Sequence, residues 1–228
     1  MNNYIIKLGH LFMITLLALI PQGLKAQDNE LIVGLRAGHN VTFGEFVATS
    51  LETNQTISED FFINGGVQYS TIGRVAIEAR PAYFKNFVWG RLAAEVLMAY
   101  THLASINSSS VGIGACVDYQ WINAKLGYYY RLYGGRGGRI AEPFNVYYEL
   151  CAHLLQKNEN WDMHLTITNN EIFELERHYQ PSFIIGCSYY PMNRLGVSFD
   201  IGCKPAGMFN LSADYYQSHI GIGVCYKW

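Results

Sequence analysis

The sequence predicts an all-β protein, a closed antiparallel transmembrane β-barrel with ten strands or, as the alternative, eight. Three observations lead to this fold class. Apolar side chains alternate with polar or small ones in blocks of roughly ten residues from residue 31 onward. The last block has a wholly apolar face and stops on an aromatic residue. Every apolar run after the N-terminal segment is interrupted by glycine or by charge, so helical membrane spans are not expected.

The last nine residues show the alternation most clearly. One face of this extended segment consists of Ile220, Ile222, Val224, Tyr226 and Trp228. The other face carries glycine, cysteine and lysine. An apolar face, a small or polar face and a terminal aromatic are typical of the closing strand of an outer-membrane barrel. We interpret the five residues as a barrel assembly signal, which implies the barrel-assembly machinery and outer-membrane lipids as partners.

The N-terminus has the features of a secretory signal peptide. Lys7 precedes a short apolar core, Leu11 to Ile20, and Ala26 precedes the expected cleavage site. The apolar core is shorter than the ~20 residues that a membrane-spanning helix needs. We therefore expect residues 1–26 to be removed on export, and residues 27–228 to form a barrel domain in the cell outer membrane.

The alternating blocks define ten candidate strands, and an even number returns the chain to the side from which it started. They are 31–39, 61–70, 74–84, 91–101, 110–120, 122–133, 143–155, 179–190, 194–204 and 214–228. The two long connections, 40–60 and 156–178, are expected to be external loops. In the eight-stranded alternative one hairpin lies outside the membrane, and residues 161–179 are the candidate for it.

The polar face of these strands carries charges of both signs and is predicted to point into the lumen. Opposite charges inside a small barrel satisfy one another, whereas an unpaired buried charge is costly. The pattern predicts a plugged lumen with an internal charge network. Its members are Arg36, Glu78, Arg80, Glu95, Asp118, Lys125, Arg131, Glu149 and Asp200.

Aromatic residues near the strand ends of the apolar face predict two membrane-interface girdles. Candidate strands that alternate in direction place Phe61, Tyr83 and Tyr119 at one rim. The other rim is predicted to hold Tyr69, Tyr100, Phe144, Tyr189, Tyr226 and Trp228. These girdles favour a membrane barrel over a soluble barrel of the lipocalin type, in which the apolar face would point inward.

Composition and motifs argue against several other functions. Charged residues make up 15% of the chain and the net charge is −2, so a nucleic-acid partner is not indicated. The five cysteines include no CxxC pair and are interpreted as packing residues. The glycine-rich segment Gly134 to Arg139 lacks the ending of a phosphate-binding loop. Acidic and histidine residues in 156–178, such as Asp162 and His164, lack tight metal-ligand spacing, so we expect neither metal nor cofactor.

The chain resembles the outer-membrane β-barrel domain proteins of the Bacteroidota, a PorT-like and broadly OmpA-barrel-like group. The matching residues are the glycine-spaced run Val33 to Asn40 in the first strand, Gly65-Gly-Val67, and Glu78 to Tyr83. The Ala26-Gln27 junction is also similar to that group's signal peptides. The resemblance implies fold and location, and it carries over no catalytic residues.

Three functions are compatible with this fold. The principal hypothesis is a non-enzymatic structural or interaction barrel whose external loops contact a protein or a glycan. The alternative is a porin-like channel for small solutes or hydrophobic ligands. The second alternative is an enzyme that modifies lipid A, which would need a nucleophile, a base and an acid. Ser50, His39 and Glu45 are residues of these types, but no motif brings them together.

Overall fold

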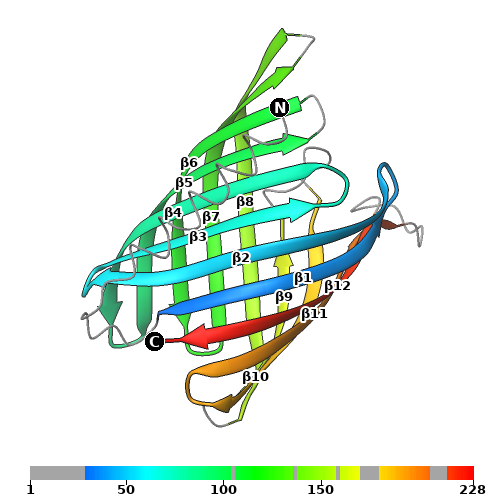
Figure 1. The fold of residues 1–228 in the computed structure, drawn as a ribbon. Helices are drawn as coiled ribbons and strands as arrows, with labels where there is room; N and C mark the ends of the chain where they lie inside the picture. Colours follow the sequence, from blue (N-terminus) through cyan, green and yellow to red (C-terminus); the bar gives the residue numbers. More distant parts are fainter. Residues whose placement is uncertain (1–28, 104–105, 136–137, 158–159, 170–179, 206–214) are drawn as a thin grey trace.

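The described residues form one closed antiparallel barrel of twelve strands, in which each strand pairs with its neighbours in the chain and β1 pairs with β12 (Figure 1). The computed structural model describes residues 29–103, 106–135, 138–157, 160–169, 180–205 and 215–228. The expected signal peptide, residues 1–26, lies outside this part. Within it, no helix has the length and apolar character needed to cross a membrane.

The strands alternate in direction around the barrel. They are β1 (Glu30–Asn40), β2 (Gly44–Ser58), β3 (Phe61–Ser70), β4 (Arg74–Phe87), β5 (Gly90–Leu103), β6 (Ile106–Tyr119), β7 (Ile122–Gly135), β8 (Gly138–Lys157), β9 (Trp161–Thr168), β10 (Ser182–Met192), β11 (Leu195–Pro205) and β12 (Tyr215–Lys227). We call the end where Glu30 pairs with Lys227 the terminal rim, and the opposite end the loop rim.

The predicted counts of ten and of eight strands are both wrong, because two segments predicted as external loops are strands of the wall. β2 lies in 40–60 and β9 lies in 156–178. The outward face of β2 carries Thr49, Thr53 and Gln55 between its apolar residues. The difference in polarity between its two faces is therefore small, and the alternation is hard to recognise. β9 alternates well but has only 8 residues. Neighbours on both sides hydrogen-bond each strand, and this support is not visible in the local sequence.

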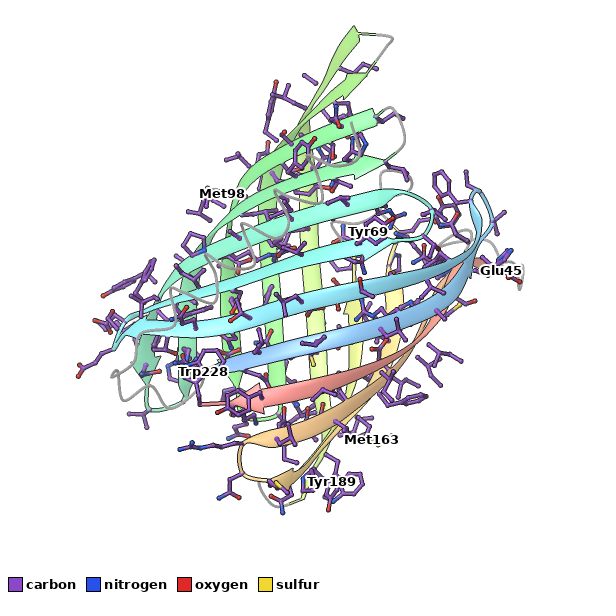
Figure 2. The ribbon with its side chains drawn as sticks, in the orientation of Figure 1. Glu45, Tyr69, Met98, Met163, Tyr189 and Trp228 are labelled. Carbon is purple, nitrogen blue, oxygen red and sulfur yellow. The ribbon has the colours of Figure 1, made fainter. Side chains whose placement is uncertain are left out.

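The missed strand β2 reverses the direction of the strands that follow it, and this changes the predicted girdles. Phe61, Tyr83 and Tyr119 lie at the terminal rim, on the same side as Tyr189, Tyr226 and Trp228. Tyr69 and Tyr100 lie toward the loop rim. Figure 2 shows Trp228 at one end of the barrel, and Tyr69 and Glu45 at the other. The side chain of Phe144 lies outside the described residues.

Outward-facing side chains form an apolar surface around the wall. On the closing strand, Ile220, Ile222, Val224 and Tyr226 alternate outward and are each between 43% and 59% exposed. Trp228 stacks on Tyr226 with ring centroids 6.2 Å apart. A contiguous apolar exterior of this kind is costly in water and matches the lipid-facing band of a membrane barrel.

The wall remains hydrogen-bonded where the short strand β9 ends beside the 20-residue β8. The Asn169 side chain takes the place of a backbone neighbour at this point. Its Oδ1 accepts a bond from Tyr148 N at 2.6 Å, and its Nδ2 donates to Val146 O at 2.9 Å. Unpaired strand edges are costly inside a membrane, so this asparagine extends the pairing of β8 by two bonds.

Large side chains fill the barrel interior along β5, β7 and β8. Leu97, Tyr129 and Tyr147 form a buried cluster there. The Tyr147 ring lies across Gly127 and Gly114, where an added Cβ would meet ring or hydroxyl atoms at 2.1 Å and 2.0 Å. Glycine is required at both positions because the tyrosine occupies the space that a side chain would take.

Replacing Gly127 by leucine is expected to lower the free energy of unfolding by about 1–3 kcal/mol or more, because the added side chain displaces the Tyr147 ring. The measurement is the thermal transition of the refolded protein in detergent micelles. Gly134→Leu on the same strand is the matched control, since no atom lies within 4 Å of its added Cβ. Equal effects of both substitutions would contradict the close contact.

Candidate functional site

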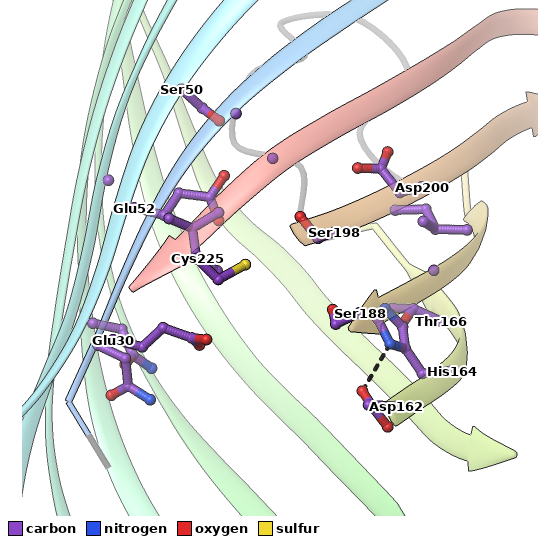
Figure 3. Close-up of a pocket in the computed structure, with 18 of the residues that line it drawn as sticks. Glu30, Ser50, Glu52, Asp162, His164, Thr166, Ser188, Ser198, Asp200 and Cys225 are labelled. Atoms are coloured by element: carbon purple, nitrogen blue, oxygen red, sulfur yellow. Dashed lines mark hydrogen bonds and ion pairs between the residues drawn. The ribbon is translucent and has the colours of Figure 1, made fainter. Parts of the chain in front are cut away.

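The opposite side of the lumen is lined by small residues and is hollow. A cavity of about 760 Å³ lies against β1, β2 and β9 to β12, and reaches across to charged residues of β4, β7 and β8. Gly34, Gly186 and Gly223 line it, together with Ser50, Ser188 and Ser198, so its wall is thin and polar. Figure 3 shows serines, carboxylates and His164 around this space. Its volume falls in the range of small-molecule pockets.

Three ion-paired groups hold cations at the cavity wall. Arg80 pairs with Glu78 and lies 3.4 Å from Glu95. Lys125 Nζ lies 2.8 Å from Glu149. Arg80 and Glu95 lie on the neighbouring strands β4 and β5, and Lys125 and Glu149 on the neighbouring strands β7 and β8, so both pairs also link adjacent strands of the wall.

The third group lies on β1 and β11, where Arg36 Nε is 3.5 Å from Asp200. His219 Nε2 approaches the same carboxylate at 3.1 Å. Gly221 gives Asp200 its space, because an added Cβ there would meet the carboxylate at 2.3 Å. The Asp200 carboxylate is therefore shared between a guanidinium and an imidazole from neighbouring strands.

Two histidines and an aspartate form a further cluster on β8 and β9. Asp162 accepts bonds from His153 Nδ1 at 2.7 Å and from His164 Nδ1 at 3.2 Å. The His164 ring lies over Gly186, where an added Cβ would meet Nε2 at 2.3 Å. A carboxylate only accepts, so each Nδ1 donates to it, and in the neutral imidazole Nε2 is then an acceptor. Figure 3 draws the contact between His164 and Asp162.

Tyr190 and Glu30 lie at the terminal end of the cavity. The Tyr190 hydroxyl donates to Glu30, and Lys227 Nζ lies 3.7 Å from the centre of the Tyr190 ring. Gly196 makes room for this ring, since an added Cβ would meet it at 2.5 Å. An aromatic ring, a carboxylate and an ammonium group therefore lie together at the terminal end of the cavity.

Toward the loop rim the lumen narrows into a layer of buried polar side chains. Asn40 donates to Gln217 at 2.9 Å across the closing seam, and both are at most 8% exposed. Ser182, Lys204 and Thr168 are also buried near this end. The lumen is consequently polar from the cavity to the loop rim.

The structure places the predicted lumen charges as follows. Arg36 and Asp200 lie together, Arg80 joins Glu78 and Glu95, and Lys125 joins Glu149. The remaining two have other contacts. Asp118 lies 4.0 Å from Arg91 and accepts a bond from Asn123. Arg131 donates to Ser110 and to Tyr133.

Sequence reasoning missed several lining residues. Glu52 lies on β2 and Asp162 with His164 on β9, two segments that had been assigned to loops. The alternation of Trp161 to Thr168 was the signal that placed Asp162 and His164 on one face. No comparable signal marked Glu52. Within the described ranges, no group of three or more histidine, cysteine or acidic residues has the geometry to hold a metal ion.

No family model and no curated protein sequence matches the chain. Solved structures do match. The NanC porin aligns at a TM-score of 0.57 and 12% identity over 86% of this chain and 100% of that chain. The translocator domain of autotransporter NalP from Neisseria meningitidis aligns at 0.56 and 12% identity over 99% and 96%. The KdgM porin in complex with disordered oligogalacturonate aligns at 0.55 and 12% identity over 87% and 99%.

The fold is that of an outer-membrane β-barrel. At these identities the likeness concerns the arrangement of the strands. The side chains of the lumen are this chain's own, and they determine its chemistry.

Replacing Arg80 by methionine is expected to cost about 3–5 kcal/mol of unfolding free energy, because the carboxyl groups of Glu78 and Glu95 would lose their shared counter-charge in the interior. Arg91→Met is the matched control. Its pair with Asp118 is 4.0 Å long and more than a third exposed, so about 1 kcal/mol or less is expected. Urea unfolding in detergent micelles measures both, and similar losses would contradict the buried pairing.

Proposed function

We propose that the protein is a porin-like outer-membrane channel that admits small polar solutes to its lumen. The observation that carries the proposal is the polar cavity of about 760 Å³ inside a twelve-stranded barrel. Barrels of about eight strands are filled by side chains and those of 16–18 strands hold open aqueous channels, so twelve strands leave room for a narrow path. The similarity in strand arrangement to the NanC and KdgM porins supports this function.

The wall chemistry favours polar solutes over hydrophobic ligands. Hydroxyl groups of Ser50, Ser188 and Ser198 and the ionic groups described above line the cavity. A hydrophobic ligand would bury these groups without hydrogen-bond partners, which is costly. We therefore restrict the channel hypothesis to water-soluble compounds.

The interaction hypothesis loses part of its basis, because much of 40–60 and of 156–178 belongs to the wall. Binding of a protein or glycan by the remaining loops stays a prediction, as do the barrel-assembly partner and the relationship to the PorT-like proteins of the Bacteroidota. Export by a signal peptide to the outer membrane also remains part of this proposal.

The lipid A-modifying enzyme remains a further prediction without a supporting site. His39 and Glu45 are register partners on β1 and β2. Ser50 faces the cavity on the other side of the sheet. These three residues therefore do not converge on one substrate position.

Ser198→Trp is expected to reduce single-channel conductance at least about twofold, because the indole would occupy the cavity that a solute must cross. The measurement is ion current through the purified protein in a planar lipid bilayer. Val197→Trp is the matched control, because Val197 is next to Ser198 on β11 but its side chain points out of the barrel and is 47% exposed. Absence of any conductance from the native protein would refute the channel.

A further inference from the structure

The balance of charge around the cavity bears on which solutes the lumen accepts. Among the described lining residues there are six carboxylates and four lysine or arginine side chains, with two histidines. Three of the four cations are already paired with carboxylates. These are Arg36, Arg80 and Lys125. Their positive charge is therefore compensated within the wall.

Two of the carboxylates have no such compensation. The side chain of Glu52 makes no hydrogen bond or ion pair with any residue in the described part of the chain, and it is only partly buried. Among the described residues, the Asp162 carboxylate bonds to the imidazoles of His153 and His164 and to no lysine or arginine. The fourth cation, Lys227, pairs in register with Glu30 at the terminal rim.

We propose that the lumen selects cationic and neutral hydroxyl-bearing solutes over anions, and that Glu52 is a principal determinant of this preference. The proposal rests on the channel function and specifies its substrate class. A narrow lumen with low-dielectric walls concentrates the field of uncompensated charges, so the excess carboxylates attract cations and repel anions.

Hydroxyl groups extend the same argument to neutral solutes. Ser50, Ser188, Ser198 and Thr166 lie around the space into which Glu52 and Asp162 face, as Figure 3 shows. Carboxylates accept hydrogen bonds, and hydroxyls both donate and accept them. An ammonium or a hydroxyl group of a solute can therefore replace its hydration shell along this wall, whereas a solute carboxylate is repelled by Glu52 and Asp162.

Reversal potentials across a planar bilayer with a potassium chloride gradient test the proposal. The native protein is expected to be cation-selective, and Glu52→Gln to reduce the cation-to-anion permeability ratio about fivefold. One unit charge roughly 8 Å away in a water-filled lumen changes the local concentration of a cation and of an anion by about twofold each, in opposite directions. Glu52→Lys is expected to shift the ratio further toward anions. Glu45→Gln is the control, because Glu45 is exposed on the outer side of the wall near the loop rim.

A second measurement does not depend on conductance. Ser188→Cys, in a background with the native cysteines replaced by serine, reports on reagents that enter the cavity. The measured quantity is the reaction rate of a cationic methanethiosulfonate divided by that of an anionic one, with both rates normalised to those for a free thiol. This ratio is expected to exceed unity. Glu52→Gln is expected to lower this normalised ratio.

The two experiments separate the failure of the proposal from the failure of the channel function. Anion selectivity of the native protein, or an unchanged ratio in Glu52→Gln, would overturn the selectivity proposal while leaving a channel. If the protein shows no conductance but Ser188→Cys reacts preferentially with the cationic reagent, the channel function is wrong and the charge preference of the cavity is retained. A silent bilayer with no reagent preference would overturn both.

Discussion

Closure of the sheet between β1 and β12 is the constraint on which the rest of this structure depends. All 11 residues of β1 have register partners on β12, from Glu30 with Lys227 to Asn40 with Gln217. In a hydrocarbon environment no water can satisfy an exposed strand edge, so a spanning sheet must close on itself. Closure fixes which face of each strand meets lipid and which faces the lumen. The charged side chains lie in the interior because closure turns their face of each strand toward the lumen.

The interior is divided into a filled side and a hollow side, and side-chain size accounts for the division. Tyr129, Tyr147 and Leu97 pack along β5, β7 and β8. Glycine and serine predominate along β1 and β9 to β12. The glycines have two different roles. Gly127 admits a neighbouring tyrosine ring, whereas Gly186 admits the His164 ring at the cavity wall. An ion-paired wall thus faces a polar cavity across the lumen.

The lumen combines compensated cations with a smaller number of uncompensated carboxylates, and these parts have different physical consequences. Buried pairs such as Arg80 with Glu95 fix the strands relative to one another, and their charges largely cancel at a distance. A partly exposed carboxylate that has no partner among the described residues, such as Glu52, still acts electrostatically on the lumen. Structural integrity and solute preference can therefore reside in different residues of one barrel.

The sequence by itself determined the barrel class, ten of the twelve strands and the inward face of the charges, because each depends on local period-two alternation. The closing strand was recognisable in this way, whereas the partner of each charged residue was not. The tertiary structure alone decided the membership of β2 and β9, and with it the direction of the strands between them. Their hydrogen bonds come from neighbours in the wall rather than from their own pattern. The same closure placed Glu52 and Asp162 at the cavity, because lumen position depends on register around the whole barrel.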